Sequence, residues 1–178
     1  KGVEVKIADD GEILIKGESL MKGYLGKEKE TKDKIKNNWL HTGDIGKFDK
    51  DNHLIITDRK KDIIVTSGGD NIAPQKIENM FTSSDLISHV IIFGDSKPFL
   101  IALIFINNDY SKKNEINSEV DKYLKKINEK LSSTEKIRKY MLINKELNQK
   151  NGFLTPTMKI KRKKVYEKYK KDIEKLYN

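Results

Sequence analysis

The sequence predicts an α+β fold built from two parts, and three observations support this prediction. Residues 3–106 contain short apolar segments separated by turn-forming residues, which is typical of strands. Residues 116–131 and 163–176 instead repeat apolar residues every three or four positions, which indicates helices. A charged cluster at 58–62 (Asp-Arg-Lys-Lys-Asp) interrupts two apolar strands, so it is the best candidate for a boundary between the two parts.

Residues 1–110 are expected to be mostly β-structure, with five or six strands. Apolar and polar residues alternate on both sides of the turn at 9–11, which predicts a β-hairpin. Further strands are predicted at 54–57, 63–66, 90–93 and 100–106.

Helices are expected at four places. One starts at Pro74, because proline suits the first helical position. A long helix carries a stripe of core-facing apolar residues, namely Ile116, Val120, Leu124, Ile127 and Leu131. Another is expected to begin near Ser133 and Thr134, with Glu135 in its first turn, and the last runs from about Lys163.

The composition is that of a folded protein with a heavily solvated surface. Of the 178 residues, 36% are apolar and 35% are charged. Cysteine is absent, which excludes disulfides and thiolate metal sites and favours a reducing, cytoplasmic environment. The longest apolar run, 99–106, has 8 residues, far fewer than the ~20 needed to span a bilayer. Because the chain opens directly in strand-like sequence, it is expected to be a fragment of a longer protein.

The positive net charge of +9 comes from residues 111–178. Residues 1–110 contain 16 basic and 18 acidic side chains, whereas residues 111–178 contain 20 basic and 9 acidic ones. Such an excess can bind nucleic acid, an anionic membrane or phosphorylated small molecules, or it can reflect compositional bias. Of the 36 basic residues 33 are lysine, whereas proteins that read nucleic acid sequence rely on arginine. No specific nucleic-acid site is expected, and bias is favoured over a dedicated polyanion site.

Two motifs combine glycine with charged residues. In the segment 39–44 (Trp-Leu-His-Thr-Gly-Asp), Asp44 follows a glycine, where its carboxylate can accept hydrogen bonds from a ribose diol. By itself, Gly-Asp is more often a plain turn pair. Gly68 and Gly69 precede the helix expected at Pro74, and paired glycines let backbone amides approach a phosphate or a pantetheine arm. A glycine turn that joins a strand to a helix explains them equally well.

A further motif, Leu-Thr-Pro-Thr-Met-Lys-Ile-Lys-Arg, occupies residues 154–162. A lysine on a loop fixed by a nearby proline can present a point charge to a carboxylate or phosphate oxygen, and so stabilise charge that develops in a transition state. By composition alone, Lys159 would be one solvated lysine among 33.

In this order and spacing, the motifs resemble those of the adenylate-forming (AMP-binding) superfamily, which includes acyl-CoA synthetases, luciferases and the adenylation domains of peptide synthetases. The resemblance covers nearly the whole chain, beginning at the Gly-Glu-Ile of residues 11–13 and the Gly-Tyr-Leu of residues 23–25. It ends at residues 151–159, which are most similar to eukaryotic long-chain fatty acyl-CoA synthetases.

The resemblance implies roles for three charged residues. Asp44 and Arg59 match the family's residues that contact the ribose of ATP or AMP. Lys159 matches the catalytic lysine that contacts the carboxylate and the α-phosphate during adenylation.

The resemblance also implies a domain organisation. Residues 1–57 would be the C-terminal, β-rich segment of a large adenylation domain. Residues 58–178 would form a small mobile α+β lid domain, a short β-sheet flanked by helices. Lys61 falls at the hinge about which this domain turns, and Gly68 and Gly69 match the loop that forms part of the CoA pantetheine tunnel.

The function implied is that of a long-chain fatty acid:CoA ligase, an AMP-forming acid–thiol ligase that uses ATP, Mg²⁺ and CoA. It would form an acyl-adenylate and then, after domain rotation, the thioester. The family's phosphate loop and acyl pocket are not found in this sequence, so the chain alone is expected to be inactive without its N-terminal adenylation domain. No metal ligands are expected in the chain. The enzyme is expected in the cytoplasm, with peripheral binding to the cytosolic face of a membrane such as the endoplasmic reticulum as an additional expectation.

Two alternatives stay open. The chain could be the C-terminal domain of another adenylate-forming enzyme, one that activates a short-chain acid or loads a carrier protein. It could also be a lysine-rich module that binds a polyanion or an anionic membrane through residues 111–178. Against nucleic-acid binding, the tyrosines of this part occur mostly at helical spacings typical of the edge of a core.

Overall fold

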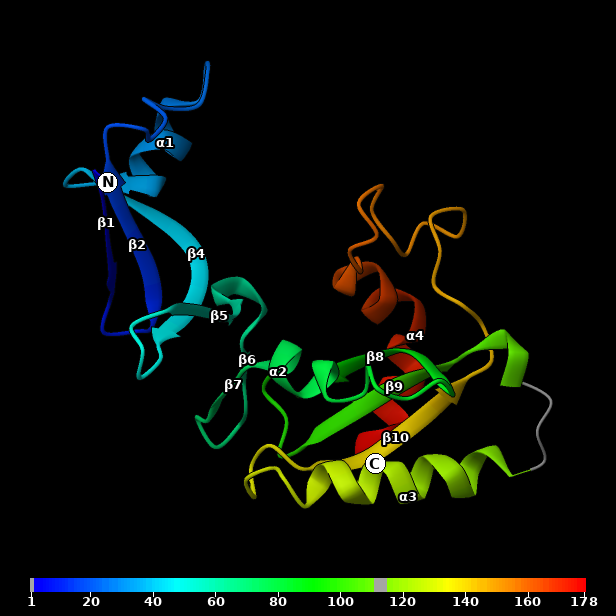
Figure 1. Ribbon diagram of the computed structural model, residues 1–178. Coiled ribbons are helices and arrows are strands. Elements are labelled where there is room, and N and C mark those ends of the chain that lie inside the picture. The colour runs from blue at the N-terminus through cyan, green and yellow to red at the C-terminus, as the bar shows by residue number, and fades with distance from the viewer. Residues whose placement is uncertain (1, 111–114) are drawn as a thin grey trace. The chain divides into compact units, whose positions relative to one another are not determined.

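The computed structural model describes residues 2–110 and 115–178, and the chain forms two compact units, Lys1–Ile63 and Ile64–Asn178. Both contain strands and helices, so the predicted α+β class is confirmed (Figure 1). The domain boundary expected between residues 57 and 58 concerns the longer protein and stays a prediction. Among the described residues, no helix is both long and apolar enough to cross a membrane.

The first unit is an antiparallel sheet with one short helix. In the sheet, β1, β2, β4 and β3 are neighbours in that order, and β5 also pairs with β4. The elements are β1 (Val3–Ile7), β2 (Glu12–Gly17), α1 (Glu28–Lys34), β3 (Ile35–Lys36), β4 (Trp39–Phe48), β5 (Leu54–Arg59) and the 3₁₀ turn η1 (Lys60–Asp62).

Strand β4 is the centre of this sheet because it pairs with three others. It needs a glycine at position 46, where a Cβ atom would lie only 2.6 Å from the Ile55 carbonyl oxygen and from the Ile13 side chain. The register also shifts between Ile45 and Gly46, and such a bulge bends a strand locally. The curved β4 therefore places Asp44 directly opposite Arg59 on β5.

The second unit is a three-stranded sheet covered by helices on both faces. Its strand order is β10-β9-β8, with β8 antiparallel and β10 parallel to β9. The elements are β6 (Ile64–Val65), β7 (Asn71–Ile72), α2 (Pro74–Asn79), β8 (Ile87–Phe93), β9 (Leu100–Ile106), η2 (Asn108–Tyr110), α3 (Ile116–Asn128), β10 (Ile137–Ile143) and α4 (Arg162–Tyr177).

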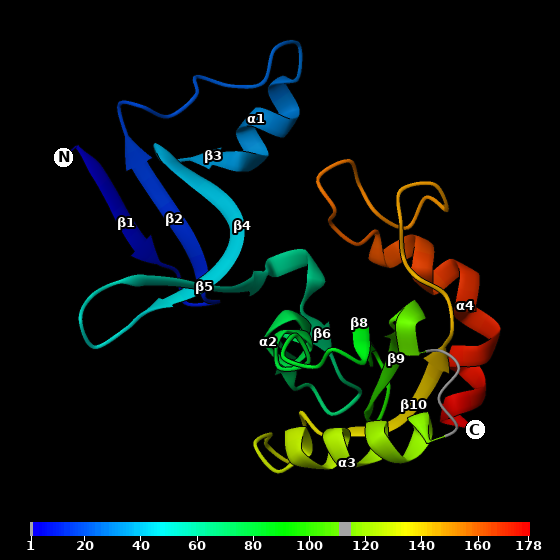
Figure 2. The same cartoon turned by 45° about the vertical axis from the view of Figure 1, so that its right-hand side comes forward.

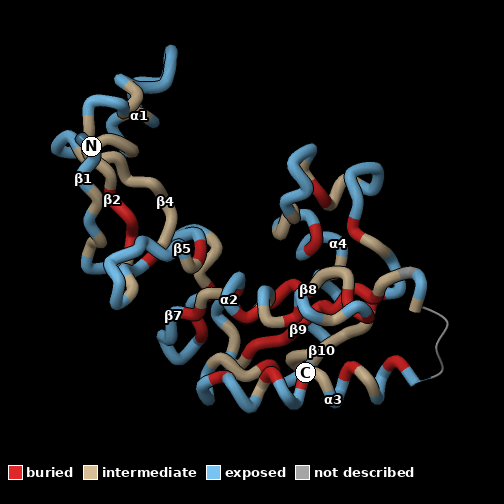
Figure 3. The backbone as a smooth tube through the Cα atoms, in the orientation of Figure 1, coloured by how far each residue is buried: buried red, intermediate tan, exposed pale blue. Residues whose placement is uncertain are grey.

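Every residue of β9 is fully buried, as expected for a continuous apolar run at the centre of a sheet (Figure 3). One face of the sheet packs against α2 and α3 through a cluster that includes Ile104 and Val120. The other packs against α4 through a second cluster that includes Leu103 and Val165. Figure 2 shows α3 and α4 on opposite sides of the sheet.

Several sequence predictions are corrected by the structure. Residues 2–110 contain nine strands rather than five or six. The two-residue strands β3 and β7, the ten-residue strand β4 and the helix α1 were not predicted. The helix expected near Ser133 is wrong. The side chain of Glu135 accepts hydrogen bonds from Ser132, as it would at the start of a helix, but here these bonds close a turn. The chain then continues as β10, which pairs with β9 and buries Ile137 and Ile143. Burial beside β9 outweighs the local helix signal.

Candidate functional site

Asp44 and Arg59 form an ion pair between neighbouring strands. They are direct cross-strand partners on β4 and β5, and Arg59 Nε lies 2.9 Å from Asp44 Oδ1. The side chains are 30% and 46% exposed, so a ligand can reach both. A carboxylate that accepts hydrogen bonds beside a guanidinium that donates them suits a hydroxyl-rich ligand that also carries negative charge.

The part of β4 just before Asp44 is held by hydrogen bonds to β2. Gly43 has a φ of +76°, a conformation that favours glycine, and its N–H donates to Glu12 Oε1 at 2.9 Å. The hydroxyl of Thr42 donates to the Ile13 carbonyl at 2.7 Å and accepts from the Asp44 N–H at 3.0 Å. These bonds fix the backbone from which the Asp44 side chain projects.

Glu12 is a buried carboxylate that sequence analysis did not single out. Only 4% of the residue is exposed, and besides Gly43 it contacts His41 Nδ1 and Lys60 Nζ, each at 3.0 Å. Burial by itself raises the pKa of Glu12, but the hydrogen bonds from His41, Lys60 and Gly43 outweigh it and hold the pKa below its usual value. The sequence feature that could have pointed to Glu12 is an acidic residue within a predicted strand, directly before the apolar residue Ile13, which is also buried.

The predicted hinge residue follows this anchored segment. Lys60 pairs with Glu12 and also with Asp10 Oδ2 at 2.6 Å, and these partners raise the pKa of Lys60. Lys61, the next residue, is exposed in η1. The chain is thus tied to the first unit up to residue 60.

The loop with Gly68 and Gly69 lines a pocket of about 380 Å³ in the second unit. Gly69, at φ +87°, donates its N–H to the Thr66 carbonyl in a tight turn. The pocket is lined by Thr66, Ser67, Gly68, Asp70, Pro98, Phe99, Ser133, Thr134, Lys136 and Arg138. The cations Lys136 and Arg138 were missed from the sequence, because only the pairing of β10 with β9 brings them to the glycine loop.

Gly68 and Gly69 were expected directly before a helix N-terminus, but the structure does not place them there. Strand β7 (Asn71–Ile72) separates Gly69 from α2, and α2 has only six residues. The turn at the pocket therefore owes its shape to the glycines and to the β6–β7 pairing rather than to a helix end.

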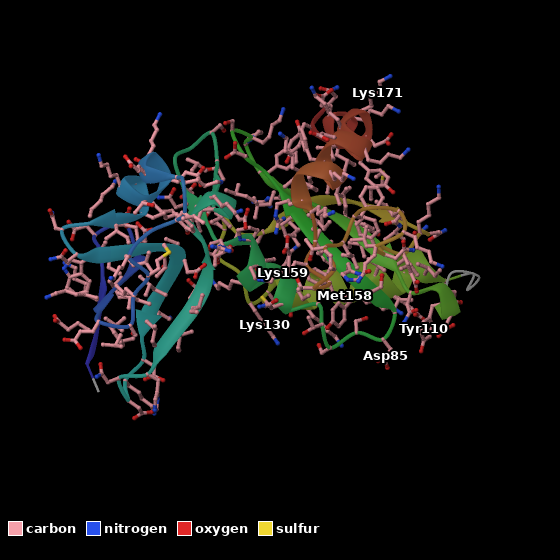
Figure 4. The ribbon with its side chains drawn as sticks, turned by 90° about the horizontal axis from the view of Figure 1, so that it is seen from above. Asp85, Tyr110, Lys130, Met158, Lys159 and Lys171 are labelled. Atoms are coloured by element: carbon pink, nitrogen blue, oxygen red, sulfur yellow. The ribbon has the colours of Figure 1, made fainter. Side chains whose placement is uncertain are left out.

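Lys159 lies on a short, hydrogen-bonded loop (Figure 4). Leu154 and Ile160 form a bridge that closes the loop, and Leu154 is buried. The Lys159 N–H donates to Thr155 Oγ1 at 3.0 Å, and the Lys159 carbonyl accepts from the Thr155 N–H at 2.8 Å. Met158 has a φ of +62°, which completes the tight turn. The backbone is held while residue 159 stays exposed.

The structure thus brings Asp44 together with Arg59 in one unit and places Gly68 beside two cations in the other. The proposed roles of these residues and of Lys61, Gly69 and Lys159 stay predictions. Within residues 2–110 and 115–178, one group of side chains, Asp49, Asp51 and His53, has ligand atoms within 4.8 Å of one another. It lies mostly exposed around the β4–β5 turn, and exposed acidic groups of this kind are common without an ion, so we assign it no role.

The fold is that of adenylate-forming enzymes. The chain superposes with a TM-score of 0.84 on the adenylation domain of a carboxylate reductase from Mycobacterium chelonae, at 22% identity over 99% of this chain and 31% of that one. It matches o-succinylbenzoate CoA synthetase from Bacillus subtilis with a TM-score of 0.72, at 25% identity over 92% of this chain and 34% of that one. Residues 61–178 match the family of AMP-binding enzyme C-terminal domains, and the chain belongs to this family.

Curated relatives have similar sequences and are much longer. The chain is 39% identical to the long-chain-fatty-acid–CoA ligase FadD15 of Mycobacterium tuberculosis, over 99% of this chain and 33% of the relative. It is 35% identical to long-chain-fatty-acid–CoA ligase 6 of Rattus norvegicus, over 95% of this chain and 27% of the relative. The chain therefore spans about a third of the length of the curated relatives it matches.

Proposed function

We propose that the chain is the C-terminal third of an ATP-dependent, AMP-forming long-chain fatty acid:CoA ligase. In the first step, a fatty-acid carboxylate oxygen attacks the α-phosphorus of ATP, and the bond to pyrophosphate breaks. In the second, the CoA thiol loses its proton and attacks the acyl carbon, and AMP leaves. Mg²⁺ would enter with the phosphates of ATP, and no step here depends on a metal ligand from this chain.

The observation that carries the proposal is the Asp44–Arg59 pair. Its two members lie 15 positions apart in the sequence, yet they contact each other on neighbouring strands, so one ribose could reach both. Asp44 would accept hydrogen bonds from the ribose hydroxyls, and Arg59 would donate to the ribose oxygens. The β4 backbone at Gly43, fixed by Glu12, would hold Asp44 in position for this contact.

Lys159 would supply the positive charge for the first step. Its loop is braced by backbone hydrogen bonds, so the flexible part is the side chain rather than its point of attachment. An ammonium group can neutralise the carboxylate that approaches the α-phosphate and the charge that develops on the phosphate oxygens. A turn at Lys61 would withdraw this group before the thiol step.

The pocket at Gly68 favours CoA as the second substrate. A tight glycine turn admits a narrow chain such as pantetheine, and Lys136 and Arg138 offer charges that complement phosphate groups. Phe99 adds an apolar wall. Binding of CoA here would use Arg138 of β10 and Lys136 just before this strand, two residues that sequence analysis left unassigned.

The long-chain substrate is supported by the relatives at 35–39% identity, which are long-chain-fatty-acid–CoA ligases. The acyl pocket itself would lie in the part of the enzyme outside this chain. Activation of another acid stays the alternative, since the matched fold also occurs in o-succinylbenzoate CoA synthetase. To decide between the two substrates, the activity of the full-length enzyme is compared for fatty acids of increasing length, short acids and amino acids.

The test of the proposal measures the two half-reactions separately in the full-length enzyme. Lys159→Ala is expected to abolish most ATP–pyrophosphate exchange and to spare thioester formation from supplied acyl-adenylate. Lys150→Ala, another exposed lysine in a nearby turn, is the matched control and should leave both steps intact. The 178-residue chain alone should show no exchange. Robust exchange by the chain alone, or equal loss of both steps in Lys159→Ala, would contradict the proposal.

A basic stripe on α4 supports a second role, binding to an anionic membrane surface on the cytosolic side. Four exposed lysines recur at helical spacing and so share one face, namely Lys164, Lys168, Lys171 and Lys175. Lys175 has an acidic partner, Asp172, at 3.6 Å. Lysine clusters gain affinity from anionic lipids, and a surface that carries fatty acid suits a ligase of fatty acids.

Vesicle sedimentation tests this role. We expect the full-length enzyme to sediment with vesicles that contain phosphatidylserine, to dissociate as salt rises, and to lose binding when the four lysines become glutamine. Equal binding to vesicles of phosphatidylcholine alone would refute the role.

A further inference from the structure

Glu78 on α2 and Arg162 at the start of α4 form a two-pronged ion pair in the second unit. Arg162 Nη1 lies 2.8 Å from Glu78 Oε1, and Arg162 Nη2 lies 2.9 Å from Glu78 Oε2. The side chains are only 10% and 27% exposed for Glu78 and Arg162, respectively. Two parallel bonds fix the plane of the guanidinium as well as its distance from the carboxylate.

The same pair also binds the backbone of β8. The Ile92 N–H donates to Glu78 Oε1 at 2.8 Å, and the Ile92 carbonyl accepts from Arg162 Nη1 at 3.1 Å. Strand β8 is at the edge of its sheet, so these backbone groups point away from β9 and need other partners. Glu78 and Arg162 thus make four hydrogen bonds, two with each other and two with the Ile92 backbone. These bonds connect α2, the edge strand β8 and the start of α4.

Arg162 comes three residues after Lys159, on the same short segment. The loop around Lys159 is held on its other side by buried Leu154, which bridges to Ile160, and by the Lys161 N–H, which donates to the Phe153 carbonyl at 2.8 Å. The loop is thus a small closed turn, and Arg162 is the side chain through which its C-terminal end is fastened to α2 and β8.

We propose that Glu78 and Arg162 are positioning residues for Lys159, an inference that rests on the adenylation role proposed for that lysine. Neither side chain need touch substrate. Their pairing fixes the position and direction of the Lys159 loop relative to the sheet, so that the ammonium group reaches the reacting oxygens at the right distance. Because Lys159 acts in the first half-reaction only, loss of the pair must impair that half-reaction selectively.

Conservative variants in the full-length enzyme test the proposal. Arg162→Lys keeps the charge but loses the two-pronged geometry, and Glu78→Gln keeps the shape but loses the charge. For both, the maximal rate of ATP–pyrophosphate exchange should fall about tenfold to a hundredfold, as expected for a misplaced catalytic group. The KM for ATP and the rate of thioester formation from supplied acyl-adenylate should stay at the wild-type values. Lys170→Gln, which breaks the exposed Lys170–Glu174 pair on the same helix, is the matched control and should change neither step.

A double variant separates positioning from general stability. Lys159→Ala combined with Arg162→Lys should lose no more exchange activity than Lys159→Ala alone, because the pair acts through the lysine. If Glu78→Gln does not fold, Arg162→Lys and this double variant decide the question. Equal impairment of both half-reactions, unimpaired exchange, or additive losses in the double variant would overturn the inference. A wild-type enzyme without any exchange would overturn the proposed function and the inference with it, whereas the other outcomes leave the proposed function standing.

Discussion

Glu12 shows how one buried charge can organise a site from a distance. It does not face a ligand itself, but it accepts a hydrogen bond from Gly43, next to Asp44, and from Lys60, next to Arg59. Both members of the Asp44–Arg59 pair are therefore flanked by residues that the same carboxylate holds. A buried carboxylate with several donors stabilises a fold only while all its partners are present.

We expect Glu12→Gln to lower the free energy of unfolding of the 178-residue chain by about 1–3 kcal/mol. The substitution removes the negative charge, and the new amide NH₂ group would face groups that are themselves hydrogen-bond donors, such as Lys60 and the Gly43 N–H. Urea titration measures this. Glu4→Gln is the control, since the Glu4–Lys16 pair is largely exposed, and it should unfold like the wild type. An equal effect of the two changes would contradict the special role of Glu12.

The acids around Lys60 also predict how stability depends on pH. The pKa values of Asp10 and Glu12 in the folded chain lie below their usual values of 3.8 and 4.5. The two carboxylates therefore contribute fully to the free energy of unfolding above about pH 4.5, and this contribution is lost as the pH falls through the lowered pKa values. The raised pKa of Lys60 adds stability that is present below pH 10.5 and is lost above it.

Urea titrations of wild type and Glu12→Gln across the acid range test this dependence. The difference between the two free energies of unfolding should be constant near neutral pH and should shrink below about pH 4.5. A difference that persists unchanged at pH 3 would show that the charge of Glu12 is not what stabilises this part of β4.

At the scale of elements, β9 dominates the stability of the second unit. It is flanked by strands on both edges and by helices on both faces, and every residue in it is buried. Strand β10 depends on this neighbour, since the residues just before it, Ser133 to Glu135, carried a helix signal that the pairing with β9 overrides. Partner strands of this kind are specified by the surface they cover as much as by their own sequence.

Leu103→Ala in β9 should therefore cost about 2–5 kcal/mol of the free energy of unfolding, because a fully buried side chain leaves a cavity between β9 and α4. The matched control is Ile56→Ala in β5, where 62% of the residue is exposed, and it should cost far less. Chemical denaturation of the 178-residue chain compares them. Comparable losses would mean that β9 is not the centre of the core.

At the scale of the whole molecule, the chain passes from one compact unit to the other between Ile63 and Ile64, just after the charged cluster 58–62. In this cluster Lys60 is anchored by Asp10 and Glu12, whereas Lys61 is exposed. A turning point at Lys61 would leave the Asp44–Arg59 pair undisturbed while the second unit changes orientation, which is what a two-step reaction with one lysine requires.

Limited digestion of the chain with trypsin should give a first cut after Arg59, Lys60 or Lys61 and leave a fragment that contains the second unit, because exposed connections between compact units are cut first. Lys139 is the internal control, since its side chain is exposed but its backbone lies in β10. Early cuts elsewhere, with residues 57–62 intact, would argue against a hinge at this place.

The sequence by itself determined the class of the fold, the buried strand at 100–106, the stripes of α3 and α4, and the resemblance that singled out Asp44, Arg59 and Lys159. These features depend on local periodicity or on short motifs, and both can be read along the chain. Only the tertiary structure decided that residues 137–143 form a strand, that Lys136 and Arg138 join Gly68 at one pocket, that Glu12 accepts hydrogen bonds from Gly43 and Lys60, and that Glu78 pairs with Arg162. Each of these depends on contacts between residues 29 to 84 positions apart or on pairing with a distant strand, and no local pattern records such contacts.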